Sequence, residues 1–153
     1  MGTIFEFEGD LDKFAKQVGI DFDTVVKKVA FDLFTRIVQK TPVDTGRARA
    51  SWNISIGEPV FTVAPDNQPA ITEADISAKA SRALAAGRKL TEPVWITNNL
   101  PYIIVLEHGG YPINPKKKTG KTKGGFSVQA PHGMVALSIE EVKLKMSVLT
   151  KVP

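Results

Sequence analysis

The sequence predicts an α+β fold: a small antiparallel sheet covered on one face by a long N-terminal helix and a C-terminal helix, with a long basic loop. Two observations indicate the helices and the sheet. Apolar residues recur at spacings of three and four in residues 22–39 and again in residues 131–149. Between these segments, shorter runs alternate apolar and polar residues, which is typical of half-buried strands. A third observation, a glycine- and lysine-rich stretch, predicts the loop.

The composition fits one domain spanning residues 1–153. A chain of 153 residues buries enough surface for a core of its own, and 42% hydrophobic and 24% charged residues are ordinary for a globular protein. The sequence contains no cysteine. Disulfides, thiolate catalysis and cysteine-ligated zinc are therefore excluded.

The first residues are read as an N-terminal arm, 1–20. They carry acidic residues where a signal peptide would need an apolar run, so we expect no export. No stretch of the chain approaches the roughly 18 apolar residues of a membrane span, and we expect no membrane partner.

The spacing of apolar residues predicts an amphipathic helix over 22–39. Asp21, Asp23 and Thr24 compete to cap its start. Two further apolar residues, Phe31 and Val38, lie round the cylinder from the main stripe and widen the apolar arc. One interpretation is a helix sunk deep in its own core. The other is that Phe31 and Val38 contact another subunit, which makes them candidate interface residues.

The segment after this helix is read as a rigid corner. Pro42 ends the helix, because the residue before a proline is pushed out of the α region. Asp44 and Thr45 can bond back to the turn, and Gly46 permits a left-handed or otherwise tight conformation. From Arg47 to position 56 the period changes to two, which predicts a strand with one polar face.

The middle of the chain predicts short elements. Residues 60–63 could pair at a sheet edge, although the neighbouring prolines exclude a central strand. Thr72 followed by Asp75 resembles a capping box and predicts a helix that stops near Gly87. The runs at 93–99 and 102–110 predict two further strands joined as a hairpin.

Residues 110–128 predict an exposed lysine- and glycine-rich loop, which we call the lysine loop. The net charge of the chain is +4 and the loop lysines supply +5, so the rest of the chain sums to −1. Three interpretations stay open: a solvated loop, a contact with DNA phosphates inside a channel, and a loop that orders on an acidic partner protein. No aromatic residues are interleaved with the lysines, which disfavours base stacking. The candidate contact residues are Lys116, Lys117, Lys118, Lys121 and Lys123.

The last predicted element is a helix that starts at Pro131 and runs toward Leu149. Its water-facing side is expected to carry Glu140, Glu141, Lys143 and Lys145. Its predicted buried stripe consists of Val135, Ile139, Val142, Met146 and Leu149.

The sequence contains few residues in patterns typical of catalytic or metal-binding sites. No P-loop, dinucleotide-binding glycine pattern, nucleophile elbow or zinc spacing is present, so we expect no enzyme, no metal and no cofactor. Glu107 ends an apolar run, where a lone carboxylate costs free energy unless it is paired. We expect Arg47 or Arg49 to pair with it. The alternative is a hydrolase or nuclease in which Glu107 acts with His108 or His132.

Three segments, in order, carry a family resemblance. "TPVDTGRARASW" follows the long helix, "PYIIVLEHG" follows a strand, and "QAPHGMV" opens the terminal helix. Together they resemble the tail-completion, or neck (head–tail joining), proteins of long-tailed bacteriophages. The lysine-rich insert is longer than the connection usual in that family, and the segment around "APDNQPAIT" matches poorly.

The resemblance implies a structural, non-enzymatic role for the matching residues. In the first two segments, the positions carried over are Pro42, Asp44, Thr45, Gly46 and Arg47, followed by Tyr102, Glu107 and Gly109. In the third they are Gln129, Ala130, Pro131, Gly133 and Met134.

The same resemblance implies a homo-oligomeric ring, commonly sixfold, in the neck of the virion. Such a ring contacts the tail tube protein on one side and a head-completion or stopper protein on the other, with possible non-specific contact with DNA in the channel. The protein would be made in the host cytoplasm. Two alternatives stay open: a tail-terminator ring protein, and a nucleic-acid-binding module that uses the lysine loop.

Overall fold

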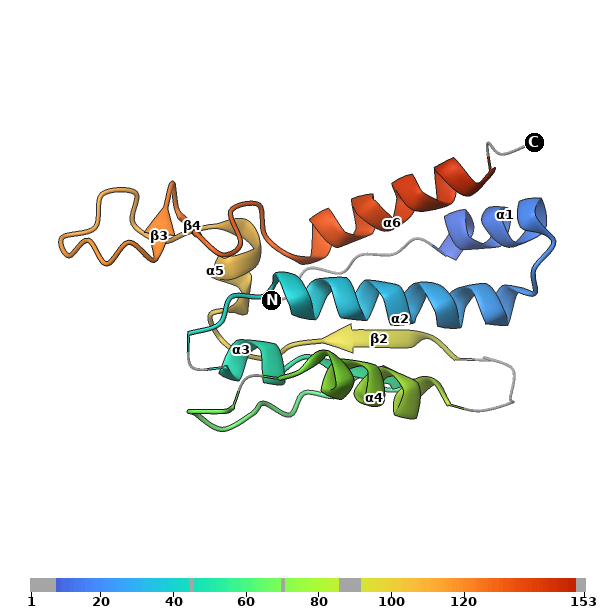
Figure 1. Ribbon diagram of the computed structural model, residues 1–153, viewed down its shortest axis with the longest axis horizontal. Coiled ribbons are helices and arrows are strands. Elements are labelled where there is room, and N and C mark those ends of the chain that lie inside the picture. Colours follow the sequence, from blue (N-terminus) through green and yellow to red (C-terminus); the bar gives the residue numbers. More distant parts are fainter. Residues whose placement is uncertain (1–7, 45, 70, 86–91, 151–153) are drawn as a thin grey trace.

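The computed structural model describes residues 8–44, 46–69, 71–85 and 92–150, and it confirms the α+β class. Within these ranges the longest helix packs against three others, and a two-stranded sheet lies on one side of it (Figure 1). The lysine loop extends away from the helices at one end of the molecule (Figure 1). No described helix is long and apolar enough to cross a membrane.

The N-terminal arm expected over 1–20 contains a helix. Helix α1, Glu8–Val18, packs against α2, Phe22–Lys40, and buries Leu11 and Ala15 there. The predicted helix over 22–39 is confirmed. Asp21 caps α2, because its carboxylate accepts a hydrogen bond from the backbone N–H of Thr24 at 3.3 Å.

The strand predicted from Arg47 begins too early. Residues Arg47–Ala50 form a single helical turn, α3, and strand β1 covers only Asn53–Ile56. The alternation of residue types in "RARAS" is compatible with both structures over so few residues. Arg49 donates back to the carbonyl of Thr41, and Arg47 donates forward to the carbonyl of Ala64; these contacts favour the turn.

Strand β2, Val94–Thr97, pairs antiparallel with β1, with Ile54 opposite Ile96. The predicted edge strand at 60–63 is wrong: this segment is irregular. It is nevertheless attached to the start of β1, because the carbonyls of Val60 and Thr62 accept hydrogen bonds from the side chain of Asn53. Side chains thus replace the backbone ladder that the proline-rich segment cannot supply.

Helix α4, Glu73–Leu84, begins with the predicted capping box. Thr72 Oγ1 accepts from the backbone N–H of Asp75 at 3.1 Å, and the Asp75 carboxylate accepts from the N–H of Thr72 at 3.0 Å. The predicted stop near Gly87 lies outside the described residues.

The second strand of the predicted hairpin is also wrong. Residues Ile103–His108 form helix α5, which buries Ile103 and Leu106, while Leu100 just before it is 2% exposed. Buried residues at a spacing of three suit a helical turn that rests one side on the core. A short apolar run does not distinguish this arrangement from a strand.

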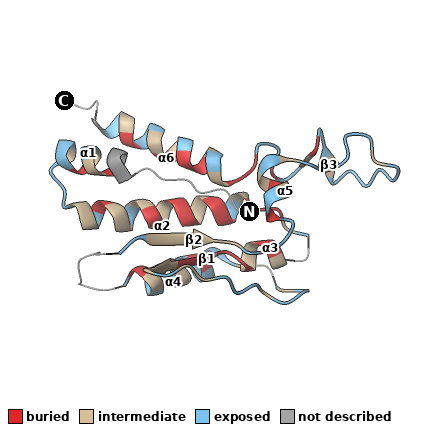
Figure 2. Ribbon diagram, turned by 180° about the vertical axis from the view of Figure 1, so that it is seen from behind, coloured by how far each residue is buried: buried red, intermediate tan, exposed pale blue. Residues whose placement is uncertain are grey.

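Helix α6, Val135–Thr150, packs against α2 and α1 and not against the sheet. The predicted layering is therefore wrong for this helix: α4 lies against β1 and packs beside α2, while α6 lies on the other side of α2 (Figure 1). Buried residues gather along α2 and on the side of α6 that faces it (Figure 2). Leu149, predicted to be buried, is 52% exposed.

Ion pairs cross from α6 to α2. Glu141, expected to face water, accepts from Arg36 Nη1 at 3.1 Å and pairs with Lys40. Lys145 Nζ lies 3.4 Å from an Asp32 carboxylate oxygen. These contacts fix which side of α6 meets α2.

Candidate functional site

The three sequence segments singled out above meet at the base of the lysine loop. The corner after α2, the end of α5 and the start of α6 are joined there by hydrogen bonds, among them bonds between residues 86 and 27 positions apart. We call this region the junction.

Glu107 closes the N-terminus of α6. Its two carboxylate oxygens accept hydrogen bonds from the backbone N–H groups of Met134, Val135 and Ala136, at 2.8 to 3.0 Å. These N–H groups belong to the first helical turn, which has no intrahelical acceptors, and the helix dipole favours a negative charge there.

The prediction that Arg47 or Arg49 pairs with Glu107 is therefore wrong, because backbone N–H groups of α6 take that place. Arg47 donates to the carbonyl of Ala64 at 2.8 Å and forms an ion pair with Asp66 at 3.2 Å. The carboxylate of Glu107 is satisfied by backbone donors on the far side of the lysine loop. Sequence spacing alone does not reveal those donors, which lie 27 to 29 positions away.

Arg49 caps the C-terminus of helix α2. Its guanidinium donates to the carbonyls of Gln39 and Thr41 at 2.8 and 2.6 Å, and so satisfies acceptors at the C-terminus of α2. Thr41 is fully buried; its hydroxyl donates to the carbonyl of Ile37 and accepts from Trp52 Nε1 at 2.8 Å. The exit from α2 is thus fastened to the start of β1.

Gln129 links the corner to the segment before α6. Its side-chain amide accepts from the backbone N–H of Val43 at 2.8 Å and donates to the carbonyl of the same residue at 2.9 Å. The pair copies the two hydrogen bonds of a sheet contact between residues 86 positions apart. The sequence pointed to Gln129 only through the family resemblance, and Val43 gave no signal.

Two glycines let the junction close. Gly46 has φ +80°, as predicted for a tight turn, and a Cβ there would stand 2.5 Å from the carbonyl oxygen of Gln68. Gly133 has φ +79°, and a Cβ there would stand 2.4 Å from the carbonyl oxygen of Glu107. Both positions combine a left-handed conformation with close backbone approach. A side chain there is disfavoured by the backbone conformation and also by the contact with the neighbouring carbonyl oxygen.

The remaining corner residues lie beside this framework. Pro42 is buried directly after α2. Asp44 is exposed and pairs with Lys121 at 3.0 Å, which links the corner to the lysine loop. Thr45 lies outside the described residues. Tyr102 precedes α5, where partial burial raises the pKa of its hydroxyl and the charge of Arg47 acts in the opposite direction.

The hydrogen bonds of the junction hold its segments in place. Glu107 is engaged by three backbone donors, so its carboxylate is held in place as an acceptor. His108 and His132, the possible catalytic partners, are both exposed. Across the described residues, no group of three or more His, Asp or Glu side chains is placed to hold a metal ion.

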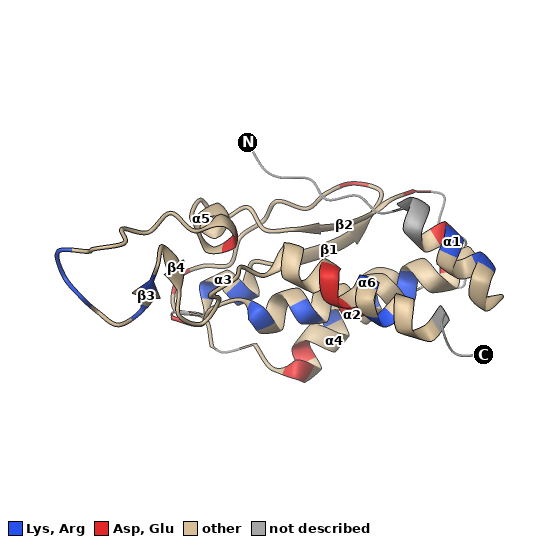
Figure 3. Ribbon diagram, turned by 90° about the horizontal axis from the view of Figure 1, so that it is seen from above, with Lys and Arg blue, Asp and Glu red and all other residues tan. Residues whose placement is uncertain are grey.

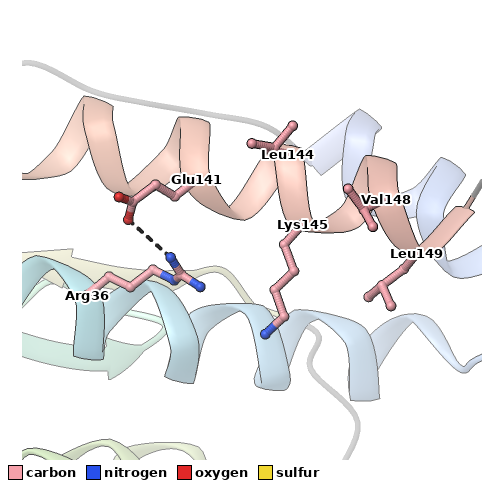
Figure 4. Close-up of a pocket in the computed structure, with 6 residues that line it drawn as sticks. All are labelled: Arg36, Glu141, Leu144, Lys145, Val148 and Leu149. Carbon is pink, nitrogen blue, oxygen red and sulfur yellow. Dashed lines mark hydrogen bonds and ion pairs between the residues drawn. The ribbon is translucent and has the colours of Figure 1, made fainter.

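Two candidate contact surfaces lie on either side of α2. The first is a shallow groove along α2 and α6 (Figure 4). Leu144 and Val148 lie along it, 66% and 56% exposed, together with Leu149. At its floor Arg36 points toward Glu141, and Asp32 raises the pKa of the Arg36 guanidinium by accepting its hydrogen bond.

The second surface is a shallow groove between α2 and α4. Phe31, a predicted interface residue, lines it with Lys27, Lys28, Ser81 and Leu84. Val38, the other predicted interface residue, is 0% exposed and belongs to the core of the subunit. The wide apolar arc of α2 is therefore explained mostly by helices packed on two sides of it.

The lysine loop carries charge of one sign. Lys116, Lys117 and Lys118 are exposed on its outer part, and Lys and Arg colour that region in Figure 3. The loop is closed at its base by a small antiparallel pair, β3, Thr122–Lys123, and β4, Phe126–Ser127.

Comparison with known proteins finds one family. Residues 5–134 match the HK97-gp10-like family model, described as "Bacteriophage HK97-gp10, putative tail-component". No curated protein and no solved structure matches the chain. The matched range contains the corner, α5 and the "QAPHGM" segment, and therefore nearly all of the junction.

Proposed function

Because this chain belongs to the HK97-gp10-like family and is thus a bacteriophage tail component, we propose that it is a structural protein of the neck. In this proposal, copies form a ring, hexameric in the expected case, that completes the tail and joins it to the head connector. One side of the ring binds the tail tube protein and the other binds a head-completion or stopper protein. The role is assembly and involves no catalysis.

The observation that carries the ring is the pair of grooves on opposite sides of α2. A closed ring needs two different surfaces on each subunit, because each copy contacts its neighbours head to tail. The α6 groove offers exposed Leu144 and Val148, and the α2–α4 groove offers Phe31 beside Lys27 and Lys28. Large aliphatic side chains left this exposed along one helix typically mark a contact surface.

We propose that the outer side of α6 in one copy packs into the Phe31 groove of the next copy. Charge is complementary in this arrangement. Glu140 lies on the exposed side of α6, one helical turn before Leu144, and Lys28 borders the Phe31 groove. The junction keeps α6 and α2 at a fixed angle, which a ring of defined size requires.

Sedimentation of two variants and their mixture tests this ring. Leu144→Ser with Val148→Ser removes one surface, and Phe31→Ser removes the other; each variant alone is expected to remain monomeric while the unaltered protein assembles. Mixed in equal amounts, the two variants retain one intact contact and should stop at dimers. Rings formed by either variant alone would overturn the head-to-tail contact.

The place in the virion is tested with particles that lack this protein. We expect tails of normal length that do not join heads, and joining should be restored by the purified protein. Tails of uncontrolled length would favour the terminator alternative, because a terminator stops tube growth. Joined particles formed without the protein would contradict both neck roles.

A further inference from the structure

We propose that residues 112–123 of the lysine loop bind the phosphate backbone of duplex DNA without sequence preference. The choice of duplex DNA among polyanions rests on the proposed function, since a neck protein lies where packaged DNA leaves the head. The charge, exposure and mounting of the loop carry the rest of the inference.

The charge of the loop is not balanced locally. Residues 108–139 contain five lysines and no aspartate or glutamate, while the whole chain has a net charge of only +4. The remaining chain therefore carries −1, so the loop is a single positive element on a nearly neutral body. Such a charge distribution attracts a polyanion to one place on the protein and not to its whole surface.

The lysines are available for an external partner. Lys116, Lys117, Lys118 and Lys123 are exposed, and within the described part of the chain none of their side chains forms an ion pair or hydrogen bond. Lys121 pairs with Asp44, but both side chains are about two-thirds exposed, at 67% and 70%. An exposed pair of this kind contributes little free energy and yields readily to a stronger partner.

The base of the loop is anchored to the body. The carbonyl of Gly125 accepts from the N–H groups of Gly110 and Tyr111 at 2.9 and 3.1 Å, and Val128 donates to the carbonyl of Lys121 at 2.9 Å. Gln129 fastens the chain beyond β4 to the corner. The loop thus extends away from the body from a closed base (Figure 1).

The residue types of the loop suit phosphates better than an acidic protein. Lysine ammonium groups are point charges that bind phosphate without a fixed geometry, and residues 112–123 contain no arginine fork and no aromatic ring for stacking on bases. A protein interface normally needs a buried apolar anchor. Ile113, 74% exposed, is the only large apolar residue in this stretch, so it serves to test the protein alternative.

Fluorescence anisotropy with a labelled mixed-sequence duplex tests the proposal over a salt series. The unaltered protein should bind more weakly as salt rises, with a slope of about 0.9 per phosphate contacted. Lys116→Gln with Lys117→Gln and Lys118→Gln should weaken binding at least tenfold at low salt and reduce the slope by about 2.7. The matched control, Lys13→Gln with Lys16→Gln and Arg82→Gln, removes the same charge from α1 and α4 and should change affinity less than about twofold.

Three results would overturn the proposal: no binding by the unaltered protein, equal loss in loop variant and control, or affinity that is independent of salt. Loss of DNA binding on Ile113→Ser, or displacement of DNA by polyglutamate at equal charge, would point to an acidic protein partner instead. Sedimentation of the same loop variant separates this inference from the ring. A variant that still assembles but no longer binds DNA supports the inference, and an unaltered protein that binds DNA without assembling would overturn the ring alone.

Discussion

Helix ends in this protein are closed by side chains from distant parts of the chain. Glu107 satisfies donors at the start of α6, and Arg49 satisfies acceptors at the end of α2. A terminal turn has several backbone groups without intrahelical partners, so one charged side chain can satisfy two or three at once. Each such residue fixes one element relative to another in addition to stabilising a helix.

At this scale we predict that Glu107→Gln lowers the free energy of unfolding by about 2 kcal/mol. The amide keeps one acceptor oxygen, but its NH₂ group faces backbone donors and the favourable charge at the helix start is lost. Urea unfolding measures the effect, with Glu58→Gln as the control because Glu58 is exposed. Equal stability of the two variants would mean that the cap contributes nothing.

Gly46 allows the close-approach effect to be separated from backbone conformation. Gly46→Ala places a Cβ 2.5 Å from a carbonyl oxygen, whereas Gly120→Ala has a similar φ, +75°, and open space around it. Both variants incur about 1 kcal/mol for the left-handed backbone, and we expect a further loss of at least about 1 kcal/mol only at Gly46. Thermal unfolding of both variants measures the difference. Equal losses would contradict the tight corner.

At the scale of elements, α6 is held on α2 by charge as well as by apolar burial. Helix α6 buries its own Ile139, Val142 and Met146. Glu141 of the same helix pairs with Lys40 and Arg36 of α2 at the edge of the contact. The hydrogen bond from Lys40 is the largest effect and lowers the pKa of Glu141; burial opposes it, and the hydrogen bond from Arg36 lowers the pKa further. Docking of α6 is therefore linked to pH.

The sign of this linkage follows from the lowered pKa. In the unfolded chain the carboxyl binds a proton near its ordinary pKa of 4.5, whereas the folded form binds one only at lower pH. The contribution is complete above the unfolded pKa and is lost as pH falls through the folded pKa. We expect the thermal stability of the Glu141→Gln variant to fall less steeply below about pH 4.5 than that of the unaltered protein. The control variant Glu140→Gln, on the exposed side of α6, should keep the steeper fall of the unaltered protein. Identical pH profiles would show that the pair is not coupled to folding.

At the scale of the whole molecule, the protein consists of a packed body and a projecting loop. The body contains the packed helices and the sheet, and the loop is attached through β3, β4 and Gln129 (Figure 1). The two parts are expected to respond independently to mutation, because the side chains of Lys116, Lys117 and Lys118 form no ion pair or hydrogen bond with the described body, and the Lys121–Asp44 pair is exposed.

We predict that deleting residues 114–118 shifts the thermal midpoint by no more than about 2 °C. Free energies of loop closure change slowly with loop length, and the segment removed lies outside the hydrogen-bonded base. Differential scanning calorimetry measures the midpoint, and circular dichroism checks that helix content is kept. A large loss of stability would show that the loop belongs to the folded body.

Secondary structure could be predicted from the sequence where the residues that specify it lie within one segment. The α2 period and the Thr72–Asp75 capping box are complete within one segment, so both predictions were confirmed. The runs at Arg47–Ala50 and Ile103–His108 were predicted as strands and are helical. Four to six residues hold too few repeats to separate a period of 2 from one of 3.6, so packing against the core decides between them.

The sequence by itself determined the long helices, the α+β class, the tight conformation at Gly46 and the family, because each depends on residues close together or on a linear pattern. Only the tertiary structure decided that Val38 lies in the core, that α6 packs on α2, and that Glu107 caps α6. A residue's partner depends on which segments fold against it, and no local spacing records that. The hydrogen bonds that join the corner, the end of α5 and the start of α6 exist only where the folded chain brings the three segments together.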